Sequence, residues 1–156
     1  MFNKAIEFFE QHNLRDRILV MEESTASAPE AASAINVSLS QIAKSLTFRT
    51  NEKPALIVMA GDAKIDSNKF RKTFKIKSKM LDLEEATKLT GYPIGGICPF
   101  DLDNNEIDVF LDISLKRNDF VYPGCGDVKT LIKLNLSELM EYSNFKGWID
   151  IGKGWE

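Results

Sequence analysis

The run of six apolar residues Ala55–Ala60 constrains the fold of this chain more than any other feature. A turn sequence at residues 51–54 precedes the run, and Gly61 and Asp62 end it. Six apolar residues without polar alternation are typical of a strand that is buried on both faces. We therefore predict that Ala55–Ala60 is a central strand of a sheet.

Shorter patterns on both sides of this run predict helices and further strands. Phe2, Ala5, Ile6 and Phe9 recur at helical spacing, so the first dozen residues are predicted to form an amphipathic helix. Further helices are predicted at residues 29–35, 39–43, 66–74 and 82–89 and from Ser137, and further strands at 17–22, 45–49, 75–80, 109–111, 120–122 and 130–134. Because these elements interleave irregularly, we predict an α+β fold with a curved mixed sheet flanked by helices.

Length and composition favour a single domain over residues 1–156 and exclude several classes of protein. The 44% of hydrophobic residues supply a core without disulfides, and the net charge of −3 argues against a positively charged coat for indiscriminate binding of nucleic acids, DNA included. No apolar run approaches the roughly 20 residues that span a bilayer, and the N-terminus carries charge where a signal peptide is apolar. We expect a cytoplasmic protein that does not bind membranes.

The few histidine and cysteine residues limit the chemistry. His12, the only histidine, lies within the predicted first helix, where a Ser-His-Asp or Cys-His arrangement would have to use it. Cys98 and Cys125 are too few for a disulfide framework, and the chain has no CxxC or HExxH spacing. We therefore expect neither a metal nor a cofactor.

A basic segment at residues 64–79 stands out in this acidic protein. It holds seven cations against the single acid Asp66, which gives a local net charge of +6; the cations are Lys64, Lys69, Arg71, Lys72, Lys75, Lys77 and Lys79. Such a segment suits a polyanion, through contacts with phosphates rather than bases. The alternative is a solvated helix face followed by an edge strand that lysines protect.

Regular structure is interrupted at residues 91–105, where three glycines and two prolines predict a long ordered loop. The adjacent Gly95 and Gly96 would let a ligand approach backbone N–H groups closely, while the prolines keep the loop rigid. The alternative is a tight crossover that Tyr92 and Phe100 pack into place. The loop is therefore a candidate site.

Three smaller features carry weaker signals. Lys44 lies at the predicted junction of helix and strand, where its ammonium group could reach into a cleft or simply be solvated. Cys98 is a candidate nucleophile, but without a partner base a small semi-apolar filler is the better interpretation. The turn at residues 124–126 is a GxG without a following helix, which is no dinucleotide fingerprint.

Together, these segments resemble the YbaK/ProRS-associated aminoacyl-tRNA editing-domain family. The resemblance runs over roughly residues 14–142 and rests on QIAKSL around Lys44, VMAGD at the end of the apolar run, TGYPIGGICPF in the loop and YPGCG at the later turn, in that order. It implies the family's fold, with a barrel-like core. It also implies a free-standing enzyme that hydrolyses the ester between a wrong amino acid and its tRNA, most often the tRNA for proline.

The resemblance implies roles for particular residues. It gives catalytic roles to Lys44, Gly95 and Gly96, and substrate-binding roles to Ile97, Cys98, Pro99, Gly124, Cys125 and Gly126. It favours Lys64, Lys69, Arg71 and Lys72 as contacts to the tRNA backbone, with a synthetase as a further partner. In this family the lysine anchors the substrate near the phosphate of the 3′-terminal adenosine. An aminoacyl ester is already activated, so no metal or cofactor is needed if the site places water and stabilises the oxyanion.

Specificity stays open among small amino acids. The cysteine-specific branch of the family has an aspartate where this chain has Leu131 and Ile132, and the alanine-specific branch has a histidine near the turn at residues 124–126, where this chain has none. Two alternatives to a deacylase remain. One is a degenerate member that binds tRNA or an adenosine-containing ligand without hydrolysis, and the other is an α+β interaction module with a merely structural glycine loop.

Overall fold

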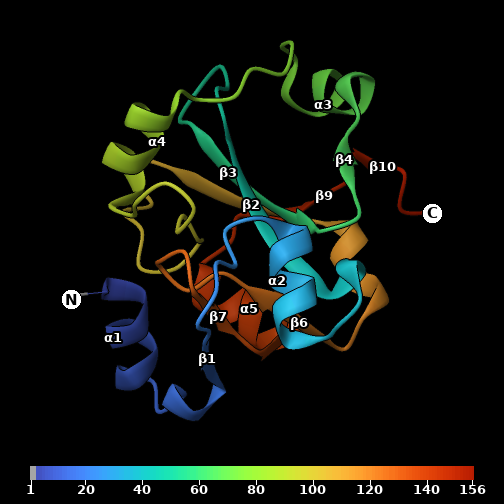
Figure 1. Cartoon of the computed structure of the whole chain (residues 1–156). Coiled ribbons are helices and arrows are strands. Elements are labelled where there is room, and N and C mark those ends of the chain that lie inside the picture. Colours follow the sequence, from blue (N-terminus) through green and yellow to red (C-terminus); the bar gives the residue numbers. More distant parts are fainter. Residues whose placement is uncertain (1–2) are drawn as a thin grey trace.

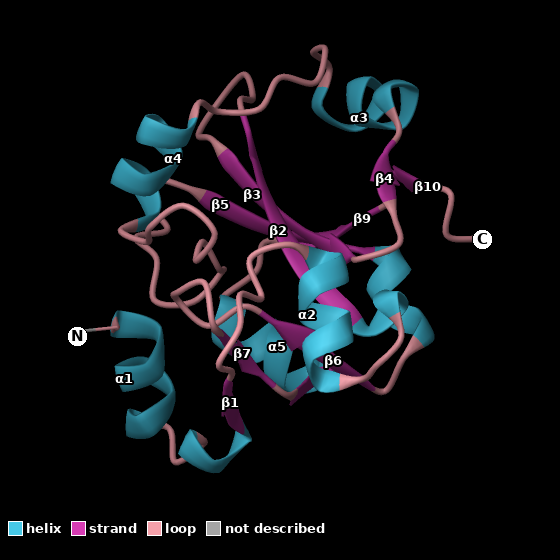
Figure 2. Ribbon diagram, viewed as in Figure 1, coloured by secondary structure: helices cyan, strands magenta, loops and turns pink. Residues whose placement is uncertain are grey.

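A computed structural model describes residues 3–156, and Figures 1 and 2 show a curved mixed sheet with helices around it. The strand order of the sheet is β8 (Leu134–Asn135), β6 (Phe120–Pro123), β2 (Ile42–Phe48), β3 (Ala55–Ala60), β5 (Asp108–Asp112) and β9 (Gly147–Ile149). β2 runs antiparallel to β3 and parallel to β6, and β3, β5 and β9 are parallel. The predicted α+β fold with a curved mixed sheet is confirmed.

Two short ribbons and the helices complete the fold. β1 (Ile18–Val20) pairs with β7 (Thr130–Ile132), and β4 (Lys64–Ile65) pairs with β10 (Gly152–Lys153). The helices are α1 (Lys4–Gln11), α2 (Ala28–Ile35), α3 (Ser67–Phe74), α4 (Leu83–Thr90) and α5 (Leu136–Ser143), with 3-10 turns η1 (Arg15–Arg17), η2 (Leu39–Gln41) and η3 (Ile113–Arg117). Within residues 3–156, none of the helices has the length and apolar character needed to cross a membrane.

The predicted central strand is β3, and every one of its residues is buried. Leu56, Val58 and Ala60 face a core that α1, α5 and the 91–105 loop cover. Ala55, Ile57 and Met59 face a second core that contains Phe70 of α3. Because successive side chains of a strand point to opposite faces, the unbroken apolar run follows from two covered faces.

Side-chain caps fix most of the helix starts where the sequence predicts them. Ser27 caps α2 by accepting a hydrogen bond from the backbone N–H of Glu30, and Asp66 and Asp82 cap α3 and α4. The first helix is confirmed as α1, although Phe2 of its predicted pattern lies outside the described residues. The predicted last helix is confirmed as α5, which begins at Leu136, one residue before the predicted Ser137, and Asn135 forms its capping box.

The predicted helix at residues 39–43 is wrong, and this changes the position of Lys44. The 3-10 turn η2 ends at Gln41, and β2 begins at Ile42 because Ile42 and Ala43 pair with Tyr122 and Pro123 of β6. Lys44 is therefore the third residue of β2 and does not lie at a junction of helix and strand.

Two predicted strands also differ from the structure. Residues 75–80 are not a strand, because Lys75 ends α3 in the left-handed conformation (φ 65°) and Met80 alone bridges to Phe48. The strand predicted at 130–134 is divided at Lys133, whose backbone N–H donates to the carbonyl oxygen of Arg17, so that β7 pairs with β1 and β8 with β6.

The C-terminal tail packs on the rest of the chain. Trp148 lies in β9 beside β5 and is half-buried against the first core, and Trp155 packs against the second core. The sequence did not predict β9, β10 or β4, because each is only two or three residues long and depends on a partner far away in the chain.

Candidate active site

A cavity of about 330 Å³ opens beside β2. Its walls come from β2, from residues 25–28 at the start of α2, from residues 80–86 around the start of α4, and from the 91–105 loop. Lys44 is the only charged residue that lines it within residues 3–156, and the rest of the lining consists of apolar and hydroxyl side chains. Of the predicted site residues, Lys44, Gly95, Ile97 and Gly124 lie on this one cavity.

The Lys44 ammonium group is held by the turn that follows β3. Nζ donates to the carbonyl oxygens of Gly61 at 3.3 Å and Ala63 at 2.5 Å. Burial lowers the pKa of Lys44 below the ordinary lysine value, and nearby Asp62 opposes this change. Because an ammonium group has three N–H donors and two are used within residues 3–156, the third is available to a ligand.

An open sheet edge forms another part of the cavity wall. β6 pairs with β2 only at Ile42 and Ala43, and the carbonyl oxygen of Thr47 accepts the backbone N–H of Leu81 on the same edge. Since backbone groups of alternate residues point to the same edge, the N–H and C=O of Ser45 lie in the gap between these two pairings. The cavity thus contains a backbone donor and an acceptor that no strand of residues 3–156 covers.

The two loop glycines are required for different reasons. Gly95 has φ +82°, and a Cβ there would lie 2.8 Å from the Val128 side chain. A Cβ on Gly96 would lie 2.7 Å from the backbone of Gly126 and Asp127. Within residues 3–156 the backbone N–H groups of Gly95 and Ile97 have no acceptor, whereas that of Gly96 donates to Pro93.

The other predicted loop and turn residues lie away from the cavity surface. Gly96, Cys98, Cys125 and Gly126 are buried behind it, where the side chain of Asn3 donates to the carbonyl oxygen of Cys125 at 3.0 Å. These residues therefore support the cavity wall.

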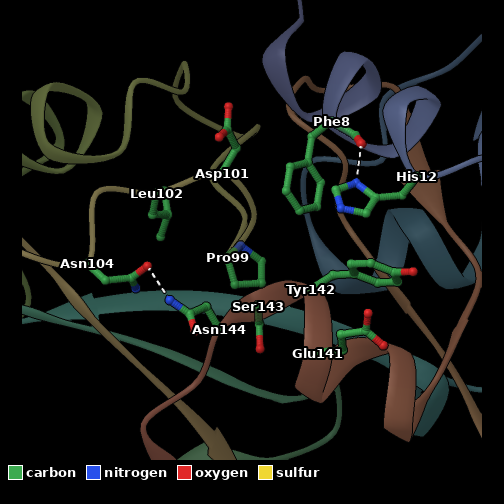
Figure 3. A pocket seen from close by; sticks show the side chains of 10 residues that line it. All are labelled: Phe8, His12, Pro99, Asp101, Leu102, Asn104, Glu141, Tyr142, Ser143 and Asn144. Carbon is green, nitrogen blue, oxygen red and sulfur yellow. Dashed lines mark hydrogen bonds between the residues drawn. The ribbon is translucent and has the colours of Figure 1, made fainter.

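Pro99 lines a second pocket of about 350 Å³, shown in Figure 3, which Asp101, Leu102 and Asn104 share with residues of α1 and α5. The His12 ring lies there between Phe8 and Tyr142, with Nδ1 2.7 Å from the carbonyl oxygen of Phe8. His12 is thus part of an aromatic cluster that lies apart from the cavity beside β2.

Both thiols are expected to be unreactive in the folded protein. Burial raises the pKa of Cys98 to about 11 and raises that of Cys125 as well. At pH 8 only about one Cys98 in a thousand would then be thiolate, which is the reactive form. We expect iodoacetamide to label neither residue in the native protein and both in denaturant, as measured by intact mass. Rapid native labelling of Cys98 would reinstate it as a candidate nucleophile.

The cations of the basic segment at residues 64–79 differ in their exposure and contacts. Lys64, Arg71 and Lys72 are exposed on β4 and α3, whereas the Lys69 ammonium donates to Asp150 at 3.1 Å and to the carbonyl oxygen of Gly152 at 3.0 Å. The exposed residues Lys75, Lys77 and Lys79 then lead from α3 to Met80 on the cavity. Six of the seven cations are therefore exposed, and the last three precede Met80 of the cavity in the sequence, whereas Lys69 is tied to the tail.

Comparison with known proteins places this chain in a family. The model of the aminoacyl-tRNA editing domain matches residues 22–142. The chain is 48% identical to the uncharacterized protein YwhH of Bacillus subtilis (strain 168) over 149 residues, which cover 95% of this chain and 94% of that protein.

Two crystal structures share the fold over nearly their whole length. The hypothetical protein APE2540 has a TM-score of 0.80 and 28% identity, with 96% of this chain and 99% of that chain covered. A protein described as a proposed trans-editing enzyme for prolyl tRNA synthetase has a TM-score of 0.83 and 25% identity, with 97% and 96% covered. With the family model matching most of its length, the chain belongs to the aminoacyl-tRNA editing-domain family.

Proposed function

We propose that this protein hydrolyses mischarged aminoacyl-tRNA and releases a small non-cognate amino acid from the tRNA for proline. The observation that carries the proposal is one small cavity that is lined both by a half-buried cation, Lys44, and by Gly95 and Ile97, whose backbone N–H groups have no acceptor within residues 3–156. Membership of the editing-domain family and the likeness to a proposed trans-editing enzyme for prolyl tRNA synthetase support it.

The proposed reaction needs only a cation that anchors the substrate and backbone donors for the oxyanion. Water attacks the ester carbonyl carbon, the bond from that carbon to the ribose oxygen breaks, and the ribose oxygen takes the proton that the water loses. The backbone N–H groups of Gly95 and Ile97 are suited to the oxyanion that develops, since fixed donors in a cavity cost no reorganisation. Lys44 serves as an anchor for the 3′-terminal phosphate, and the neighbouring ribose hydroxyl helps to activate water.

The size of the cavity supports small substrates. A volume of about 330 Å³ is at the lower end of small-molecule sites. The C=O of Ser45 on the open edge of β2 is suited to accept a hydrogen bond from the substrate's α-ammonium group. An apolar pocket distinguishes one methylene by only about 1–3 kcal/mol, so several small aminoacyl groups would be accepted.

The direct test is release of amino acid from purified tRNA for proline charged with alanine, cysteine or proline. We expect alanine or cysteine to be released well above the spontaneous rate and proline to be retained. The measurement is the loss of acid-precipitable labelled amino acid with time. Binding of tRNA without release from any of these esters would instead support the degenerate, binding-only alternative, and neither binding nor release would support the interaction module.

The exposed cations of α3 are expected to bind tRNA backbone. Replacing Arg71 and Lys72 together by Ala should weaken tRNA binding and reduce the slope of log affinity against log salt by roughly 1.4–1.8, because two phosphate contacts are lost. The control is Arg15→Ala with Lys88→Ala, which removes two exposed cations from other elements. An unchanged slope for the α3 variant would leave these residues as an ordinary solvated face.

A further inference from the structure

The turn that holds Lys44 carries a carboxylate at its centre. Asp62 lies between Gly61 and Ala63, the two residues whose carbonyl oxygens accept the Lys44 ammonium group. No ion pair within 4.0 Å joins Asp62 to Lys44, although Asp62 is close enough to affect the pKa of Lys44. A carboxylate and an ammonium group therefore stand close together without pairing.

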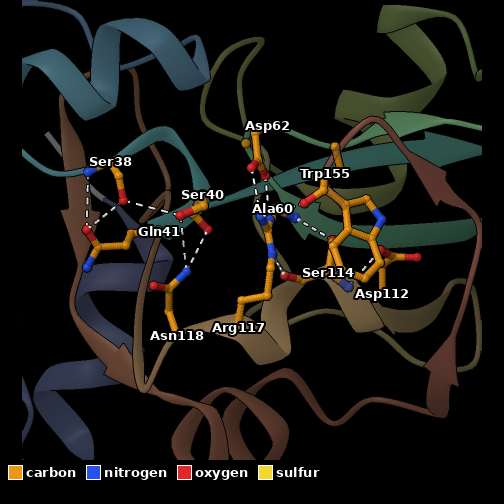
Figure 4. Close-up of polar contacts among 12 residues, drawn as sticks. Ser38, Ser40, Gln41, Ala60, Asp62, Asp112, Ser114, Arg117, Asn118 and Trp155 are labelled. Atoms are coloured by element: carbon orange, nitrogen blue, oxygen red, sulfur yellow. Dashed lines mark hydrogen bonds and ion pairs between the residues drawn. The ribbon is translucent and has the colours of Figure 1, made fainter.

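The partner of Asp62 is Arg117, at the end of η3 (Figure 4). Nη1 donates to one carboxylate oxygen at 2.8 Å, and Nη2 donates to the other at 2.5 Å. This two-bond geometry between guanidinium and carboxylate is the strongest form of such a pair. The hydrogen bond from Arg117 is the main reason that the pKa of Asp62 lies below its ordinary value.

Arg117 is itself held in place by the chain around it. Its Nε donates to the carbonyl oxygen of Ser114 at 3.0 Å, and Nη1 also donates to that of Trp155 at 3.1 Å. The Trp155 ring lies 5.0 Å from the guanidinium carbon. The side chains of Arg117 and Asp62 are only 29% and 28% exposed, so this pair is much less screened by water than a surface pair.

We propose that Arg117 is a positioning residue that keeps the Asp62 carboxylate away from Lys44 and so leaves the ammonium group available to the cavity. Without Arg117, Asp62 would be an unpaired, half-buried carboxylate beside Lys44, the only cation among residues 3–156 that lines the cavity. The two would then pair, and the carboxylate would take the third N–H of the Lys44 ammonium group, which is otherwise available to a ligand. The functional part of this inference rests on the proposed function, in which Lys44 binds the anionic end of the substrate.

Few charged groups act on Lys44, so the effect of losing Arg117 on the pKa of Lys44 should be measurable. Asp62 on the turn and Lys64 on β4 are the charged groups that act on it, and Arg117 acts through Asp62. If Arg117 is lost, the attraction of an unpaired Asp62 for the ammonium group grows and the pKa of Lys44 rises. Replacing Asp62 by Asn as well removes that attraction.

The experiment compares Arg117→Met with the double variant Asp62→Asn/Arg117→Met. For Arg117→Met we expect about tenfold lower kcat/KM for alanyl-tRNA, mainly through a higher KM, together with a raised pKa of Lys44 in ¹³Cε lysine NMR titration. For the double variant we expect kcat/KM to return to within about threefold of the wild-type value. We also expect the pKa of Lys44 to return close to its wild-type value. A merely structural role of Arg117 would leave the double variant at least as impaired as the single one.

Two outcomes overturn the proposal: a pKa of Lys44 that is the same in Arg117→Met as in wild type, or a double variant that stays as impaired as the single one. Arg17→Met is the matched control, because it removes another half-buried pair, Arg17 with Glu138 at 2.9 Å. Arg117→Gln replaces Arg117→Met if the latter fails to fold. If wild type releases no amino acid, the proposed function fails while the NMR titration still tests the inference.

Discussion

Lys44→Met should slow the release of alanine from alanyl-tRNA for proline by about 100-fold or more, because the substrate loses the anchor that holds its 3′-terminal phosphate and so positions the ester. Met has nearly the length of Lys but no charge, so the variant removes the only charged group that lines the cavity within residues 3–156. Lys44→Arg keeps the charge and should retain part of the activity. The measurement is kcat/KM from single- and multiple-turnover deacylation.

The stability of Lys44→Met separates a loss of function from a loss of fold. Burial lowers the pKa of Lys44, so folding costs free energy while the amine is charged at neutral pH. In wild type this cost disappears as pH rises through the lowered pKa toward 10.5, because the unfolded chain then holds more protons than the folded one. We expect the free energy of unfolding of Lys44→Met at pH 7 to stay within about 1 kcal/mol of wild type.

The control for Lys44→Met is Lys88→Met, which removes an exposed lysine of α4 that does not line the cavity. It should release alanine at the wild-type rate. Equal and slow release by wild type and by Lys44→Met would contradict the proposed enzyme.

Local patterns predicted the parts of the fold that depend on neighbouring residues. The six apolar residues of β3 required cover on both faces, and the structure supplies it through two cores. Ser27, Asp66 and Asp82 cap α2, α3 and α4 close to the predicted helix starts, because a cap needs only a backbone N–H two or three residues later. That residues 1–156 form a single domain remains a prediction.

Features that depend on distant partners were not predictable from local patterns. Residues 75–80 alternate as a strand does, but only Met80 finds a partner, so the pattern remains a loop. Lys44 became part of a strand because β6 pairs with Ile42 and Ala43. The pair of Asp62 and Arg117 joins residues 55 positions apart, and neither residue carries a motif that reveals the other.

The candidate site followed from the resemblance and not from periodicity. QIAKSL and the glycine loop indicated Lys44, Gly95 and Ile97, and these do line one cavity. The open edge at Ser45 has no sequence signal, because it is produced by a gap between two strand pairings. A role in hydrolysis for each of these residues stays a prediction until variants are measured.

Gly96→Ala is expected to have a large effect on both stability and activity. The added Cβ would lie 2.7 Å from the carbonyl oxygen of Gly126 and from the Cα of Asp127, and backbone atoms of a buried turn cannot move aside as a flexible side chain can. Forcing an extra methyl group into such packing costs about 1–3 kcal/mol, which urea unfolding would measure as a lower midpoint.

The close packing of Gly96 against Gly126 and Asp127 should also make Gly96→Ala less active. Gly96 lies between Gly95 and Ile97, so a shift of the loop away from the turn moves both cavity-lining residues and their N–H donors. We expect deacylation by folded Gly96→Ala to fall by about tenfold or more, since misplacing donors by a fraction of an ångström weakens their hold on the oxyanion.

Gly124→Ala is the matched control, because a Cβ at Gly124 meets no atom of residues 3–156 within 4 Å beyond its chain neighbours, and its φ lies outside the left-handed region. Stability should then be unchanged or slightly higher, since alanine restricts the unfolded chain more than glycine does. Because Gly124 lines the cavity, its new methyl group should reduce release of the larger amino acid more than that of alanine. If Gly96→Ala matched Gly124→Ala in unfolding midpoint and in release of alanine, the close packing of loop and turn would not be what shapes the cavity.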